Sequence, residues 1–154
     1  MSLDKLDRQI LSLYQHDTRL PAEQIGAQVG LSAAAVQRRL KRLREAGVIL
    51  AETASLDLRQ IGLGLVAIVS VDLVDESARA LRAFRDKVLV RADVQHCYGV
   101  TGPADYVLIV VVADLAAYDA FCKACLLHDP NVRSFSTQIA LETPKRSATV
   151  GIPD

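Results

Sequence analysis

The chain has 154 residues, of which 51% are hydrophobic and 23% charged, and its formal net charge is zero. This composition excludes an intrinsically disordered chain, which would be poorer in hydrophobic residues and richer in net charge. The longest strongly apolar run, residues 107–113, is about a third of a transmembrane helix, so no membrane span is expected. The three cysteines show no paired framework and polar residues begin at Asp4, so we expect a soluble, cytoplasmic protein without a signal peptide.

The zero net charge hides an asymmetry between the two halves of the chain. Residues 1–50 carry eight Lys/Arg and five Asp/Glu, a net charge of +3. Residues 51–60 have a net charge of −1, and residues 61–154 carry nine Lys/Arg and eleven Asp/Glu, a net charge of −2. A basic segment joined to a mildly acidic one is typical of a polyanion-binding module attached to a second domain.

Three helices are predicted in the first 46 residues. Asp4 is a suitable N-cap for the first, whose apolar residues recur at helical spacing up to Tyr14. Pro21 suits the first position of a second helix, which Gly30 ends in the left-handed conformation. Ser32 is placed to cap a third helix. The second and third helices form a helix-turn-helix, and residues 48–50 are predicted to begin a small β-wing.

The third helix has a face suited to the major groove of DNA. Its apolar residues at positions 36, 40 and 43 lie within about 40° of one another, and the opposite face is small at its N-terminal end and basic along its length. Small residues let a helix end approach base edges, and long cations reach phosphates or pair with guanine. The residues expected near DNA are Ser32, Ala34, Ala35, Gln37, Arg38, Arg39, Lys41, Arg42 and Arg44, with Arg38 and Arg42 the best candidates for base contacts. Because exposed helices commonly carry cations, the charge run alone also fits a solvated surface.

After a linker at residues 57–64 the periodicity changes. The predicted elements are strands at 65–71, 94–100, 106–113 and 132–141, and helices at 77–88 and 114–127, with a turn at 101–105. The order βαββαβ predicts a ferredoxin-like sandwich, a four-stranded antiparallel sheet with helices on one face. Since the other face of such a sheet needs cover, self-association is expected.

The whole chain is therefore interpreted as α+β. A winged helix-turn-helix domain is assigned to residues 1–56, and the linker follows at 57–64. A ferredoxin-like (RAM-type) domain for oligomerisation and effector binding is assigned to residues 65–142. The tail at 143–154, which contains Pro144 and Pro153, is expected to be extended or loose.

Four sequence runs together resemble the Lrp/AsnC, or feast/famine, transcriptional regulators. They are Leu3-Asp4-x-x-Asp7-x-x-Ile10-Leu11, Ile25-Gly26-x-x-Val29-Gly30-Leu31-Ser32, Val36-x-x-Arg39-x-x-x-Leu43-x-x-x-Gly47-Val48-Ile49 and Val100-Thr101-Gly102-x-x-Asp105-Tyr106. The resemblance covers nearly the whole chain, ending at Lys145. It implies a sequence-specific regulator that binds double-stranded DNA as a homo-oligomer: a dimer, with tetramers or octamers built from it.

The resemblance also implies that an amino acid or related small metabolite binds between dimers near the turn. The candidate effector residues are Val100, Thr101, Gly102, Pro103, Ala104, Asp105 and Thr137. Backbone N–H groups around Gly102 can cradle a carboxylate, and Asp105 can accept from an ammonium group. Pro103-Ala104 and Phe135 depart from the family pattern and make the region more apolar, which indicates a non-basic effector or none. A simple β-turn capped by Asp105 is the alternative.

The sequence also suggests four other functions: a zinc site, a redox-sensing thiol, an enzyme and a protein-interaction module. Cys122-x-x-Cys125-x-x-His128 has zinc-like residue types, but on a helix these positions sweep 120° rather than converge, so no metal and no cofactor are expected. A redox-sensing thiol remains a further possibility. Some proteins resembling this family are haem-pathway decarboxylases, which would need exposed His and Arg around a large cleft; this chain has only three histidines. We therefore expect that the protein is not an enzyme. After the regulator and the enzyme, the third hypothesis is a protein-interaction module that uses the open face of the sheet.

Overall fold

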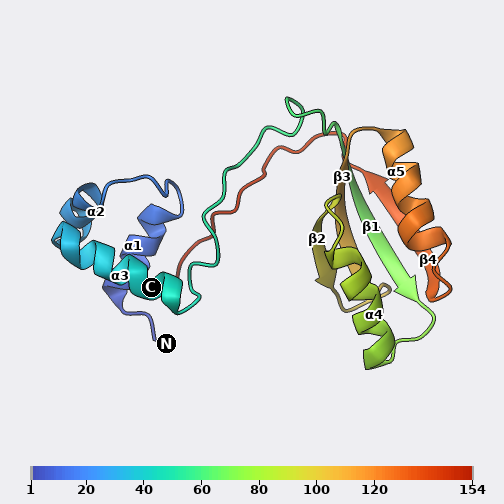
Figure 1. Ribbon diagram of the computed structural model, residues 1–154, viewed down its shortest axis with the longest axis horizontal. Helices are drawn as coiled ribbons and strands as arrows, with labels where there is room; N and C mark the ends of the chain where they lie inside the picture. Colours follow the sequence, from blue (N-terminus) through green and yellow to red (C-terminus); the bar gives the residue numbers. More distant parts are fainter. Residues whose placement is uncertain (1, 154) are drawn as a thin grey trace. The chain divides into compact units, whose positions relative to one another are not determined.

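The computed structural model describes residues 2–153, which fall into two compact units. Residues 2–55 and 145–153 make up one unit, and residues 56–144 make up the other. Figure 1 labels the helices and strands of each. None of the described helices is long and apolar enough to cross a membrane.

Three helices form the N-terminal unit: α1 (Lys5–Tyr14), α2 (Ala22–Val29) and α3 (Ala33–Glu45). The predicted cap of α1 is confirmed. Asp4 Oδ1 accepts a hydrogen bond from the backbone N–H of Asp7 at 2.8 Å, and the Asp7 carboxylate accepts from the Asp4 N–H at 3.2 Å. This reciprocal pair satisfies backbone donors that the first turn of a helix leaves free.

The connection between α2 and α3 is a tight turn at residues 30–32. Gly30 ends α2 with φ +74°, a conformation that costs glycine little, as predicted. Ser32 Oγ accepts from the Ala35 N–H at 3.3 Å and caps α3, also as predicted. Pro21 lies one position earlier than expected, since it is the N-cap of α2 rather than its first residue.

The three helices enclose a small apolar core around Ile10, Ile25 and Val36. The predicted wing is wrong, because the described residues between 46 and 64 contain no strand. The N–H groups of Val48 and Ile49 donate instead to the carbonyl oxygen of Leu43, at 2.9 and 3.2 Å. Backbone groups that a wing would pair with another strand are used to close the C-terminal end of α3.

The second unit has the predicted ferredoxin-like fold, with the element order β1 (Leu65–Leu73), α4 (Ala78–Leu89), β2 (Val94–Gly99), β3 (Tyr106–Val112), α5 (Leu115–Cys122) and β4 (Val132–Ile139). The strands form one antiparallel sheet in the order β2-β3-β1-β4. Figure 1 shows α4 and α5 on the same face of this sheet.

Helices cover one face of the sheet and leave the other face without a covering layer. On β1, Ala67, Val69 and Val71 are fully buried within the core that includes residues of α4 and α5. The intervening side chains, such as Val66 and Ile68, are only half-buried because they point to the face without helices. An apolar sheet face without a covering layer favours self-association.

The helix predicted for residues 114–127 is interrupted. Asp114 caps α5 as predicted, but α5 ends at Cys122 and the chain continues as a π-helical turn, Lys123–Leu127. Lys87 Nζ donates to the carbonyl oxygen of Cys125 at 2.6 Å and also pairs with Asp129. The widened turn is therefore held from α4, the neighbouring helix.

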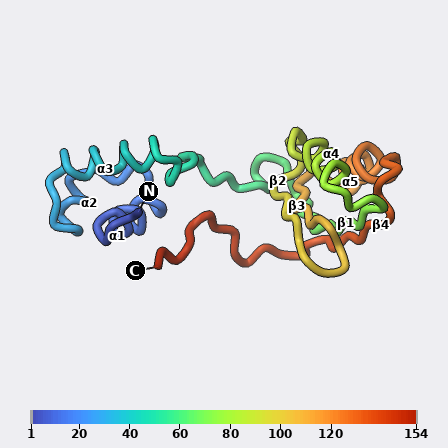
Figure 2. Tube along the Cα trace, turned by 90° about the horizontal axis from the view of Figure 1, so that it is seen from below, coloured from blue at the N-terminus to red at the C-terminus, as the bar shows by residue number. Residues whose placement is uncertain are grey.

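The C-terminal tail carries no helix or strand and runs as an extended trace (Figure 2), but hydrogen bonds hold it. The Gln15 side chain donates to the carbonyl oxygen of Val150 at 2.9 Å and accepts from the Val150 N–H at 3.0 Å. Arg8 donates to the carbonyl oxygen of Pro153 at 3.1 Å. The tail is thus tied to α1 of the N-terminal unit, which the sequence did not predict.

Candidate nucleic-acid interface and ligand-binding region

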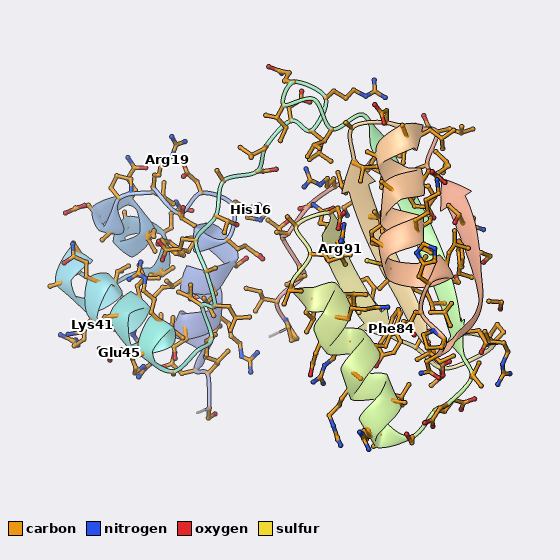
Figure 3. All side chains as sticks on the ribbon, turned by 45° about the vertical axis from the view of Figure 1, so that its right-hand side comes forward. His16, Arg19, Lys41, Glu45, Phe84 and Arg91 are labelled. Atoms are coloured by element: carbon orange, nitrogen blue, oxygen red, sulfur yellow. The ribbon has the colours of Figure 1, made fainter. Side chains whose placement is uncertain are left out.

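The outer face of α3 presents a short polar row. Ala34, Gln37, Arg38 and Lys41 are all exposed, and their spacing places them on one side of the helix. Among the described residues, no hydrogen bond or ion pair involves the Arg38 side chain. Lys41 has only a loose contact at 3.9 Å with Glu45, and both side chains are largely exposed (Figure 3). Such a surface pair contributes little, so these two cations are available for a polyanion.

Arg39 and Arg42, which are predicted to contact DNA, are paired with carboxylates at the N-terminal end of α1. Arg39 donates to Asp7 Oδ1 and to Asp4 Oδ2, both at 2.7 Å. Arg42 donates to the two oxygens of Asp7 at 2.7 and 2.6 Å. Asp7 is the buried charged residue of the described chain, with 0% exposure. A buried carboxylate needs partners of this kind, so both arginines have a structural role that the sequence analysis did not predict. Their contact with DNA stays a prediction.

Arg44 is also engaged within the N-terminal unit, and its predicted contact with DNA stays a prediction. It donates to Glu52 at 2.7 Å and to the hydroxyl of Tyr14 at 2.7 Å, and its guanidinium lies 5.6 Å from the centre of the Tyr14 ring. The hydrogen bond from Arg44 lowers the pKa of the Glu52 carboxyl. This cluster fastens the end of α3 to α1 and to the segment that follows.

The N-terminal end of α3 keeps the small residues that were expected there. Ser32 is exposed, while Ala35 is half-buried and donates its N–H to the Ser32 hydroxyl. Ala34 and Gln37 point to the same side as Arg38. A helix end with short side chains and free backbone N–H groups can approach a phosphate or a base edge closely.

The turn at residues 100–105 is well ordered by its own hydrogen bonds. The Val100 N–H donates to the Asp105 carbonyl oxygen at 3.0 Å, and Gly102 has φ +118°, which side chains rarely adopt. Asp105 Oδ2 accepts from the N–H of Leu73 at 2.7 Å and so caps the end of β1. The Asp105 side chain therefore has a structural role, at β1 rather than within the turn that the β-turn alternative expected it to cap. Thr101, Gly102 and Pro103 are exposed, and Ala104 is half-buried.

Thr137 is remote from this turn within one chain. It lies on β4, opposite Val69 of β1, so β1 separates it from Asp105 by roughly 14 Å according to strand geometry. Its hydroxyl is 2.5 Å from that of Tyr118. Burial is the larger cause and a hydrogen bond with Cys122 the second, and together they raise the pKa of Tyr118 to about 12. The sequence grouped Thr137 with the turn, and the strand order separates them.

A groove of about 570 Å³ lies along α5 and is almost entirely apolar. The side chains that line it are Leu115, Ala116, Tyr118, Asp119, Cys122, Leu127 and Phe135. Phe135 comes from β4, two residues before Thr137, and is the departure from the family pattern noted in the sequence. The groove has the size of a small-molecule site but few polar groups to orient a ligand.

The thiols offer no metal site. Cys97, Cys122 and Cys125 are free, and among the described residues no group of three or more His, Cys, Asp or Glu is placed to hold an ion. Burial raises the pKa of the Cys97 and Cys125 thiols, which disfavours the reactive thiolate.

Asp7 and Tyr14 are the residues of this region whose roles the sequence analysis missed. A signal was present for both. Asp7, Ile10 and Tyr14 follow one another at i, i+3 and i+7, which places the carboxylate of Asp7 on the buried face of α1. A charge on a buried face predicts a buried partner of opposite sign.

Comparison with known proteins assigns both units to one family. The family model for the AsnC-type helix-turn-helix domain matches residues 3–44, and that for the Lrp/AsnC ligand binding domain matches residues 66–150. The Bkd operon transcriptional regulator of Pseudomonas aeruginosa is 36% identical over 141 residues, with 92% of each chain covered. An uncharacterised HTH-type transcriptional regulator of Sinorhizobium fredii is 35% identical over 153 residues, or 99% of this chain and 89% of that protein.

Solved structures agree with this assignment. An AsnC family transcriptional regulator from Agrobacterium tumefaciens has a TM-score of 0.89 at 34% identity, and a regulator from Neisseria meningitidis, solved in complex with L-Met, has 0.88 at 29%; each covers 97% of both chains. The chain belongs to the Lrp/AsnC family of transcriptional regulators. It is a DNA-binding regulator with the family's ligand-binding domain and not an enzyme, and the decarboxylase alternative has no support.

Proposed function

We propose that the chain reads its operator with the outer face of α3. The proposed contacts are Ser32, Ala34, Ala35, Gln37, Arg38 and Lys41, with Arg38 as the base-reading or phosphate-reading cation. The observation that carries this proposal is that the Arg38 side chain is exposed and has no partner among residues 2–153, on the face opposite the core of the unit. In this proposal residues 1–56 bind DNA, and residues 65–142 form the oligomer and bind the ligand.

Arg38→Ala tests this face. Loss of a base contact should weaken binding to the selected operator by about 1–3 kcal/mol and relax sequence preference at that position. Selection of genomic fragments followed by fluorescence anisotropy measures both quantities. A uniform loss on all duplexes would make Arg38 a phosphate contact only, and unchanged binding to every duplex would remove α3's outer face from the proposal.

We further propose a homodimer formed through the sheet face that no helix covers. Val66, Ile68 and Val107 are among the half-buried apolar side chains of this face. Two-fold symmetry would then supply two copies of α3 for a near-palindromic operator. A charged substitution at its centre, Ile68→Asp, should shift the mass measured by light scattering towards the monomer. The matched substitution Val74→Asp, at an exposed residue beyond β1, should leave the mass unchanged.

The effector that we propose is a non-basic amino acid or related metabolite, bound where the 100–105 turn of one chain meets a second copy. The backbone around Gly102 is exposed, and the L-Met complex of the Neisseria regulator supports an amino acid as ligand. Thr137 would come from the second copy, because it is remote from the turn within one chain. Light scattering and DNA binding with each amino acid in turn would identify the ligand. No response to any of them would refute an amino-acid effector.

A DNA-binding regulator acts where the DNA is, and we propose the cytoplasm. Fractionation of cells that express the tagged protein tests this location. Recovery with membranes would contradict it.

A further inference from the structure

Helix α3 carries five cations in seven positions, but they do not share one environment. Arg38 and Lys41 are free or nearly free, whereas Arg39 and Arg42 converge on one carboxylate of α1. That carboxylate, Asp7, has a side-chain exposure of 1%. The Arg39 and Arg42 side chains are 22% and 48% exposed, so both can be reached from solvent while they hold Asp7.

The position of these arginines on α3 explains why they have a choice of partner. Arg39 lies about 60° and Arg42 about 120° from the centre of the buried stripe, on the same side. An arginine at such a flank is long enough to reach inward to α1 or outward to a phosphate. In this structure Asp7 holds both arginines through three contacts of 2.6–2.7 Å, and Arg39 makes a fourth, to Asp4, at 2.7 Å.

A phosphate would compete poorly for these two guanidinium groups. If Arg42 moved to DNA, both oxygens of Asp7 would lose a donor while the carboxylate stayed buried. Asp7 would keep only Arg39 and the Asp4 N–H as partners, and taking a partner from a buried charge is destabilising, whereas an arginine on a solvated phosphate gains less. Arg39 is held more firmly still, because it bridges Asp7 and Asp4.

We infer that Asp7 is a positioning residue that sets the specificity of DNA binding by keeping Arg39 and Arg42 off the phosphates. Contacts to phosphates add affinity for every sequence alike, whereas base contacts discriminate. Withholding two cations therefore raises the ratio of specific to non-specific affinity. The inference rests on the proposed DNA face of α3 and adds to it a residue of α1 that does not touch DNA.

The salt dependence of DNA binding tests the inference, because a purely architectural role would not change it. For the full-length protein, the logarithm of affinity for a non-operator duplex is measured against the logarithm of salt concentration by fluorescence anisotropy. Each arginine released to a phosphate should steepen the slope by roughly 0.9 per chain. Asp7→Asn should therefore steepen it and lower the specific-to-non-specific ratio. Asp4→Asn removes the same charge from an exposed position and should change the slope much less.

Variants of the arginines keep the test decisive if Asp7→Asn proves unstable. Arg42→Gln and Arg39→Gln should leave the slope as in the wild type. The variant Arg38→Gln/Lys41→Gln removes both available cations of the proposed face and should reduce the magnitude of the slope by roughly 0.9 or more. The double variant Asp7→Asn/Arg42→Gln should reverse part of the steepening. A slope reduced by Arg42→Gln would overturn the inference about Asp7 and leave the proposed DNA face standing. An unchanged slope for Arg38→Gln/Lys41→Gln would instead overturn the proposed DNA face.

Discussion

Replacing Gly26 with alanine should destabilise the helix-turn-helix and weaken DNA binding with it. Gly26 is buried in α2, and a Cβ built there would lie 2.3 Å from the carbonyl oxygen of Leu31 and 3.3 Å from its carbonyl carbon. The Leu31 N–H donates to the Gly26 carbonyl oxygen at 2.9 Å. The turn that sets the angle between α2 and α3 is therefore in direct contact with this glycine.

Two effects of opposite sign decide the magnitude. Alanine is the better helix former by about 1 kcal/mol. Against this gain, the new methyl falls about 1 Å short of an ordinary contact distance. The obstacle is backbone, so no side chain can rotate away. Overpacking of a close-packed site costs about 1–3 kcal/mol and occasionally more, and a backbone clash of this size belongs at the upper end. The net loss should be about 2 kcal/mol.

Peptide-level hydrogen exchange on the full chain measures this loss, because it reports the opening of residues 22–45 separately from the other unit. Gly30→Ala is the control: its Cβ would meet nothing within 4 Å, and only its φ of +74° penalises alanine, by about 1–2 kcal/mol. It should leave the spacing of α2 and α3 intact and cost less DNA affinity than Gly26→Ala. A Gly26→Ala protein as stable as the wild type would refute the reasoning.

Three further predictions concern other hydrogen bonds. Asp105→Ala should lower the free energy of unfolding of the C-terminal unit by about 1–3 kcal/mol, because the N–H of Leu73 at the end of β1 loses its acceptor. Asp105→Asn should lower it less, and denaturant titration compares the two variants. The pKa of Tyr118 is raised from 10.0 to about 12, so the stability that its neutral hydroxyl contributes is complete below pH 10 and is lost as the pH rises towards 12. Tyr118→Phe should therefore flatten this part of the alkaline unfolding curve, and an unchanged curve would contradict the prediction. Gln15→Ala should speed amide exchange at Val150 without affecting the sheet, and unaltered exchange there would mean that other contacts hold the tail.

Features that depend on local chemistry were predictable from the sequence. The caps at Asp4, Ser32 and Asp114 and the left-handed Gly30 follow from interactions within a few residues. The wing was wrong because pairing into a sheet depends on a remote strand, and the N–H groups of residues 48 and 49 had a nearer acceptor in Leu43.

The ligand region shows a second limit of the same kind. Sequence pattern linked Thr137 to the turn at residues 100–105, but a motif match carries no information about strand order. The sheet inserts β1 between them and gives Thr137 a local partner in Tyr118. A site that used both elements would have to take them from two chains, which agrees with the position between dimers that the resemblance implies.

The charge of the N-terminal half also has to be interpreted through its partners. A net charge of +3 over residues 1–50 indicated a polyanion-binding module, and five cations on α3 indicated a dense field. Three of the five cations are bound by Asp4, Asp7 and Glu52, so most of this charge stabilises the unit. Arg38 and Lys41 are the cations of this helix without a close carboxylate partner among the described residues. If these two face DNA, as we propose, the helix makes fewer phosphate contacts than its composition suggests, which would favour recognition by base edges over attraction to any duplex.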